Sequence, residues 1–119
     1  MTIHEIADRL VQLCARGQFE EAQKELFAED AISIEPYATP AFDKETRGLA
    51  AILEKGKKFD SMVQTMHNLE VSAPLIATQS FAVTMRLDVT MKERGHMDMT
   101  EICLYKVQDG KIVSEEFFL

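Results

Sequence analysis

The segment Ser80–Leu119 reads SFAVTMRLDVTMKERGHMDMTEICLYKVQDGKIVSEEFFL. Its apolar side chains recur at every second position, which is the period of a strand with one buried face. The turn-forming sequences Glu93-Arg94-Gly95 and Asp109-Gly110 divide it, and Asp-Gly is a strong signal for a two-residue hairpin. The segment therefore predicts three consecutive antiparallel strands, near residues 80–92, 96–107 and 111–119.

The preceding residues contain mainly helical patterns. Apolar side chains at three- and four-residue spacing predict helices over residues 3–14, 19–27 and 46–60. Short strands are predicted over 31–37 and 63–76, the second of them joining the meander. Helices followed by an antiparallel meander indicate an α+β domain with the helices gathered on one face of the sheet.

Composition limits both the size and the partners of this domain. The chain has 119 residues, of which 46% are hydrophobic, and a formal net charge of −7. We expect one domain spanning residues 1–119. An acidic chain with no basic run is not expected to bind nucleic acid or an anionic membrane surface. No apolar run is long enough to span a bilayer, and the N-terminal residues do not resemble a signal peptide, so we expect a cytoplasmic protein.

The strand alternation places ionisable groups on the apolar, inner face of the sheet. Glu101 shares that face with Met99 and Cys103, and strict alternation adds His67 and Glu115. An ionised carboxylate is costly to bury unless it has a partner. Three interpretations remain: Glu101 is solvated at an open mouth, is paired for structural reasons, or belongs to a ligand pocket. The expected wall of such a pocket consists of Tyr37, Met85, Met99, Cys103, Tyr105, Glu115 and Phe117.

We expect no metal at this site. His67 and Glu101 would supply only two ligands, fewer than a zinc site needs. Cys14 and Cys103 lie in apolar surroundings far apart in the sequence, which favours two buried thiols over a disulfide.

The opposite, outer face of the sheet also carries apolar side chains. Such a patch usually marks an interface, and two sheets packed back to back would form a homodimer. Isolated exposed apolar residues are the alternative. The predicted patch consists of Met66, Ile102, Leu104, Ile112 and Phe118.

Four short motifs, in this order, resemble the nuclear transport factor 2-like superfamily. They are Leu26–Ala31 (LFAEDA), Glu35-Pro36, Arg47-Gly48 and Asp109–Val113 (DGKIV). The closest branches are the SnoaL-like polyketide cyclases and the ketosteroid isomerase-like proteins. The resemblance covers nearly the whole chain. It implies a cystatin-like α+β roll, in which a cone-shaped, curved antiparallel sheet carries the N-terminal helices on its concave face.

The resemblance also implies roles for individual residues. Ketosteroid isomerase combines a carboxylate base with an oxyanion hole formed by a tyrosine and a protonated acid. The base falls on Glu35 and the protonated acid on Glu101. The tyrosine position falls on Leu10, which cannot donate a hydrogen bond, so steroid isomerisation is not expected; Tyr37, Tyr105 or His67 are the remaining candidate donors.

The orientation of Glu35 stays open at this point. If Ile32 and Ile34 face the core, alternation turns Glu35 away from the pocket; if they pack under another element, Glu35 points inward with Ser33. Our leading hypothesis is a pocket for a small apolar organic molecule, with Glu101, Glu35 and His67 as catalytic groups for cofactor-free proton transfer or hydrolysis. The alternative is a non-catalytic dimeric module for ligand binding or protein interaction.

Overall fold

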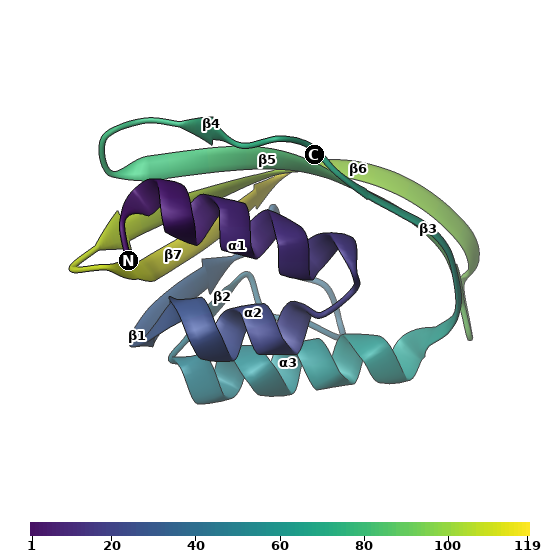
Figure 1. The fold of residues 1–119 in the computed structure, drawn as a ribbon. Coiled ribbons are helices and arrows are strands. Elements are labelled where there is room, and N and C mark those ends of the chain that lie inside the picture. Colours follow the sequence, from purple (N-terminus) through teal and green to yellow (C-terminus); the bar gives the residue numbers. More distant parts are fainter.

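A computed structural model describes all 119 residues as three helices packed against one curved, seven-stranded sheet (Figure 1). The strand order is β2-β1-β7-β6-β5-β3, with the short β4 paired to β5. The expected α+β class is confirmed. The elements are α1 (Ile3–Ala15), α2 (Phe19–Leu26), β1 (Phe27–Ile34), β2 (Glu45–Arg47), α3 (Leu49–Met62), β3 (Val63–Val71), β4 (Leu75–Ile76), β5 (Ser80–Met91), β6 (Gly95–Gln108) and β7 (Lys111–Phe118).

The C-terminal meander forms as the alternating pattern predicts. β5 and β6 pair without a register shift from Ser80 opposite Lys106 to Met91 opposite Gly95. The β6–β7 turn places Asp109 and Gly110 at φ 52° and 74°, the left-handed conformation that an Asp-Gly hairpin turn needs. The strands β5, β6 and β7 are therefore determined by local sequence signals.

Two features of the N-terminal half differ from the expectation. β1 pairs in parallel with β7, so the sheet is mixed rather than purely antiparallel. The short strand β2 was not predicted; its last two residues, Thr46 and Arg47, were assigned to the third helix by the helical pattern. Gly48, at φ 91°, separates β2 from α3, which begins at Leu49.

The helices cover the concave side of the sheet and close its core (Figure 1). α1 begins with a capping box between Thr2 and Glu5 and packs against β3, β4 and β5, while α3 packs against β1. The buried faces of the helices meet the inner face of the sheet in one continuous core. None of the helices is both long enough and apolar enough to cross a membrane.

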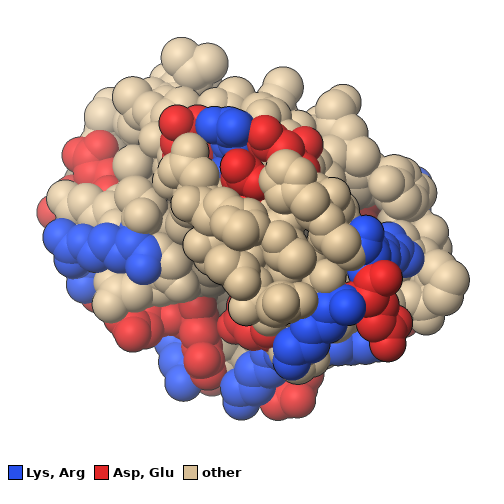
Figure 2. All heavy atoms as spheres, turned by 90° about the vertical axis from the view of Figure 1, so that its right-hand side faces the viewer, with Lys and Arg blue, Asp and Glu red and all other residues tan.

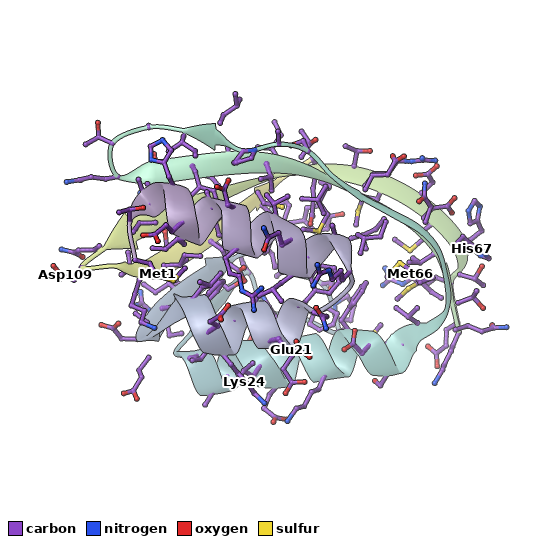
Figure 3. The ribbon with its side chains drawn as sticks, viewed as in Figure 1. Met1, Glu21, Lys24, Met66, His67 and Asp109 are labelled. Carbon is purple, nitrogen blue, oxygen red and sulfur yellow. The ribbon has the colours of Figure 1, made fainter.

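β-Bulges correct three assignments that strict alternation had made. A register shift between Met66 and Asn68 inserts an extra residue in β3, which turns His67 to the outer face. Met66 pairs with Val89, a core residue, so it lies on the inner side and leaves the predicted outer patch, although its side chain is still 41% exposed. Figure 3 shows His67 projecting away from the helices. A second shift beside Val107 turns Ile112 into the core, where it is completely buried.

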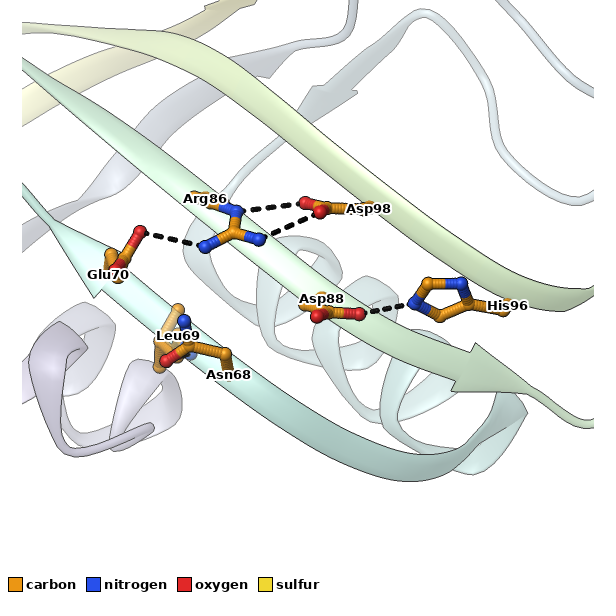
Figure 4. Close-up of polar contacts among 7 residues, drawn as sticks. All are labelled: Asn68, Leu69, Glu70, Arg86, Asp88, His96 and Asp98. Atoms are coloured by element: carbon orange, nitrogen blue, oxygen red, sulfur yellow. Dashed lines mark hydrogen bonds and ion pairs between the residues drawn. The ribbon is translucent and has the colours of Figure 1, made fainter.

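The outer face has a polar end and an apolar end. At the polar end, Arg86 forms ion pairs with Asp98 and Glu70, while Asp88 pairs with His96 (Figure 4). At the same end, His67 shares a hydrogen bond with Thr90, outside the core. Figure 2 shows the end of the molecule that lies on the right of Figure 1, where a largely uncharged surface is bordered by charged side chains of both signs.

At the apolar end, Ile102 and Phe118 are opposite one another on β6 and β7, 50% and 42% exposed, beside the half-buried Leu104. We expect these three residues to form the contact of a homodimer. Sedimentation at micromolar concentration should find a dimer for the wild type and a monomer for Ile102→Asp. Thr100→Asp, on the same face of β6 but next to Arg86, is the matched control and should stay dimeric. A wild-type monomer would contradict the prediction.

Candidate functional site

A cavity of about 320 Å³ lies between the helices and the inner face of the sheet. Most of its lining side chains are hydrophobic, and five of them are methionines from α3, β5 and β6. The lining includes Met62, Met85, Met91, Met97, Met99, Tyr105 and Phe117. A cavity of this size and character is typical of a site for a small organic molecule.

Eight of the ten predicted site residues line this cavity. They are Glu35, Tyr37, Met85, Met99, Glu101, Tyr105, Glu115 and Phe117. Cys103 is fully buried behind the wall, where its thiol contacts Glu101. His67 lies on the outer face of the sheet, so we no longer assign it a role in the site. The structure contains no group of three or more His, Cys, Asp or Glu side chains that could hold a metal ion.

The backbone of β1 settles the orientation of Glu35. Ala31 and Ser33 are completely buried on the inner side, whereas Ile32 and Ile34 are only half-buried on the outer side. The alternation therefore directs the next inward position, Glu35, into the cavity. Of the two alternatives, the one that turned Glu35 inward together with Ser33 is confirmed.

Lys55 is the site residue that sequence reasoning missed. It comes from the middle of α3, and its Nζ donates hydrogen bonds to Ser33 Oγ at 2.5 Å and to Glu35 Oε1 at 3.0 Å. The ammonium also lies over the Phe117 ring, 5.7 Å from its centre. A signal existed: Lys55 is three residues after the buried Ile52 and four before Phe59, which puts it on the apolar face of its helix.

Ser33 connects Lys55 to a buried carboxylate. Its hydroxyl accepts from Lys55 and donates to Glu115 Oε2 at 2.6 Å. Ser33 and Glu115 are opposite one another on the parallel strands β1 and β7. Both are buried, with exposed fractions of 0% and 4%. Burial raises the pKa of Glu115, while the Ser33 hydroxyl and the Lys55 charge act in the opposite direction.

Glu101 is the carboxylate with the weakest partner. Its only hydrogen bond in the protein comes from the Cys103 thiol, with Sγ 3.8 Å from Oε1. Burial raises the pKa of Glu101 to about 7, and the negative charge of Glu35 acts in the same direction. Burial also raises the pKa of the Cys103 thiol, so the thiol keeps its proton and acts as a donor. Near neutral pH, Glu101 is therefore able both to give and to accept a proton.

The polar groups of the cavity form one coupled unit. Glu35, Lys55, Ser33 and Glu115 are joined by hydrogen bonds, and the charges of Glu35, Glu115 and Lys55 all affect the pKa of Glu101. Perturbed carboxylates in an apolar cavity are typical of proton-transfer sites. Chemically, the unit contains a proton donor and acceptor in Glu101 and a fixed ion pair of Lys55 with Glu35.

The raised pKa of Glu101 predicts how stability depends on pH. Between pH 4.5, its ordinary value, and about 7, the folded protein binds more protons than the unfolded chain, so stability falls as pH rises. Glu101→Gln cannot ionise and escapes this loss. At low pH, we expect the variant and the wild type to have the same free energy of unfolding in urea. Above neutrality, the free energy of unfolding of the variant should be larger by up to about 3 kcal/mol. Equal stability of the two proteins at all pH values would contradict this assignment.

A separate variant tests the two hydrogen bonds by which Ser33 joins Lys55 to Glu115. Ser33→Ala removes a hydroxyl that serves two charged partners in the interior, which is expected to cost about 1–3 kcal/mol in the free energy of unfolding. Ser114→Ala, at a half-buried position on the outer side of β7, is the matched control and should cost less. Urea unfolding measures both. Equal losses would show that the hydroxyl of Ser33 contributes nothing specific.

Comparison with known proteins supports the family assignment. A family model described as a SnoaL-like domain matches residues 1–119. A putative SnoaL-like polyketide cyclase from Mesorhizobium loti is 31% identical, with 100% of both chains covered and a TM-score of 0.93. A protein of unknown function with a cystatin-like fold from Xanthomonas campestris is 18% identical over 99% of this chain and 90% of that chain, with a TM-score of 0.83.

A putative isomerase from Bacillus subtilis shares the fold at 20% identity, over 98% of this chain and 88% of that chain, with a TM-score of 0.69. No curated protein sequence matches the chain. The full-length match of the family model, together with the cyclase-like structure over the whole chain, confirms the resemblance found in the sequence motifs. The chain belongs to the SnoaL-like domain family.

Proposed function

We propose that this protein binds a small, largely apolar organic molecule in the cavity and moves a proton between two of its atoms. The observation that carries the proposal is Glu101: a carboxylate on the cavity wall, with a pKa of about 7 and only a thiol as hydrogen-bond partner. A general acid or base is most effective when its pKa is close to the working pH. Glu101 meets that condition through burial and its neighbours.

The other polar groups have supporting roles in this proposal. Glu101 takes a proton from the bound molecule and returns it at a second position. The Lys55–Glu35 ion pair keeps a fixed dipole at the cavity wall, which costs no reorganisation when charge moves in the ligand. Ser33 is a positioning residue, because it holds Lys55 without lining the cavity itself, and Glu115 holds Ser33 in turn.

Descriptions of related proteins are compatible with such chemistry. The similar proteins from Mesorhizobium loti and Bacillus subtilis are described as a putative polyketide cyclase and a putative isomerase. Both reaction types require protons to be moved between positions of one molecule. The alternative function, a non-catalytic dimeric module, is favoured by the exposed Ile102 and Phe118 and needs no chemistry in the cavity.

Carbon–hydrogen exchange distinguishes the two functions. Indanone is a small aromatic ketone whose exchangeable carbon-bound protons are followed by proton NMR in heavy water. We expect the wild type to accelerate this exchange, and Glu101→Gln to reduce the acceleration by about 10²-fold or more. Glu116→Gln removes the same charge from the outer face of β7 and should leave the rate unchanged.

Binding is measured separately by the line broadening of the ligand signals. Ligand that binds to the wild type but exchanges at the rate of the buffer would favour the non-catalytic module. Acceleration that survives Glu101→Gln would contradict the role given to Glu101. Stability is recorded for each variant, since Glu101→Gln is expected to be at least as stable as the wild type and a loss of rate then reflects lost chemistry.

A further inference from the structure

The charges of the cavity are unevenly distributed. Among its buried and half-buried lining residues are three carboxylates, Glu35, Glu101 and Glu115, and a single cation, Lys55. The other charged lining residues are exposed: Glu20, Lys57, Asp60 and Arg94. Lys55 already gives two of its three N–H groups to Ser33 and Glu35, and its charge is balanced by Glu35 at 3.0 Å. The interior of the cavity therefore contains no uncompensated positive charge with which to attract an anion, and the unpaired Arg94 is exposed to solvent.

Glu101, in contrast, is a negative charge without a strong partner. Its carboxylate faces the cavity, and the only donor that the protein offers it is the Cys103 thiol, 3.8 Å away. The groups that surround it are Glu35 at the end of β1, Lys55 on α3, Glu115 on β7 and Cys103 on β6; Met85 lies opposite on β5. Without a ligand, a proton from solvent supplies the missing positive charge, because an ionised carboxylate is expensive in these surroundings.

The apolar wall of the cavity is suited to a cation as well. The Phe117 ring already carries the Lys55 ammonium over one face, 5.7 Å from the centre of the ring. Aromatic faces attract cations through the ring quadrupole, and thioether sulfurs are soft and polarisable. Methionines from three elements, α3, β5 and β6, line the same cavity.

We propose that the ligand of this cavity is an organic cation, a protonated amine or imine on an apolar body, with the Glu101 carboxylate as its counter-ion. The inference rests on the proposed function, since it names the class of molecule that the same cavity binds. The ligand's N–H group takes the place of the proton on Glu101, and its apolar body packs against the methionine and aromatic wall.

A protonated imine also fits the proposed chemistry. The Glu101 carboxylate takes a proton from the carbon next to the C=N⁺ group; the C–H electron pair forms a C=C bond and the C=N π pair moves onto nitrogen. The products are a neutral enamine and a neutral Glu101, so the step cancels one charge pair. Deprotonation next to a neutral carbonyl instead moves a negative charge onto the ligand, within reach of Glu35 and Glu115, so we expect it to be slower than deprotonation of the protonated imine.

Three probes with one apolar body separate ligand charge from ligand shape: naphthylmethylamine, naphthylmethanol and naphthoic acid. We expect the amine to bind about tenfold or more tightly than the alcohol at about pH 8, as a charge-assisted hydrogen bond predicts, and the acid to bind weakest. The amine-to-alcohol ratio should fall between about pH 8 and about pH 6, because Glu101 takes up its proton there. Titration calorimetry with the full-length protein measures all three affinities.

Two variants locate the charge that is responsible. Glu101→Gln should bring the amine and the alcohol to within about threefold of each other and remove the pH dependence of their ratio. Glu116→Gln, which removes a carboxylate from the outer face, should leave the ratio as in the wild type. A ratio that is unaffected by Glu101→Gln would overturn the assignment of Glu101 as counter-ion.

The outcomes separate this inference from the proposed function. If the alcohol or the acid binds as tightly as the amine, the cationic ligand is wrong, while a cavity that binds small organic molecules stands. If none of the three probes binds to the wild type, the small-molecule cavity itself fails, and the cationic ligand fails with it. If the amine binds most tightly and only through Glu101, both are supported.

Discussion

The ammonium group of Lys55 allows an apolar cavity to contain three carboxylates. It pairs with Glu35 directly and reaches Glu115 through the Ser33 hydroxyl, so two of the three negative charges are partnered. Without this cation, only the neutral donors Ser33 and Cys103 would offset the desolvation cost of the buried carboxylates. Glu101 is the one left with a weak partner, and its unusual proton affinity follows from that difference.

The position of this unit depends on the topology of the sheet. The parallel pairing of β1 with β7 places Ser33 directly opposite Glu115, which brings their side chains to hydrogen-bonding distance although they are far apart in sequence. α3 packs on β1 with Ile52 completely buried, and Lys55, one turn further along, points at Ser33 from above the sheet. The only parallel strand pair in the sheet is thus the one that assembles the charged groups.

The fold and the wall of the cavity could be predicted because they depend on local patterns. Alternation put Met99, Glu101 and Cys103 on the inner face of β6, and the Asp109-Gly110 turn fixed the hairpin. The errors have a different origin. A β-bulge interrupts the alternation of side chains along a strand without leaving a clear signal in sequence, which is why His67 and Ile112 were misplaced. Lys55 was missed because its partners come from distant strands.

Glu101 lowers the stability of the folded protein, and this cost is informative about its role. A carboxylate whose pKa is raised by burial destabilises the folded protein above that pKa, and Gln at the same position would have the same shape without the charge. The surrounding structure nevertheless satisfies every other buried polar side chain, so the loose contact of Glu101 with Cys103 is not a sign of generally poor packing. Such a local exception to otherwise complete hydrogen bonding is expected where a group must remain available to a ligand. The same water-excluding wall that creates the cost also raises the proton affinity of Glu101 into the range useful for acid–base chemistry, so stability and reactivity are set here by one property of the cavity.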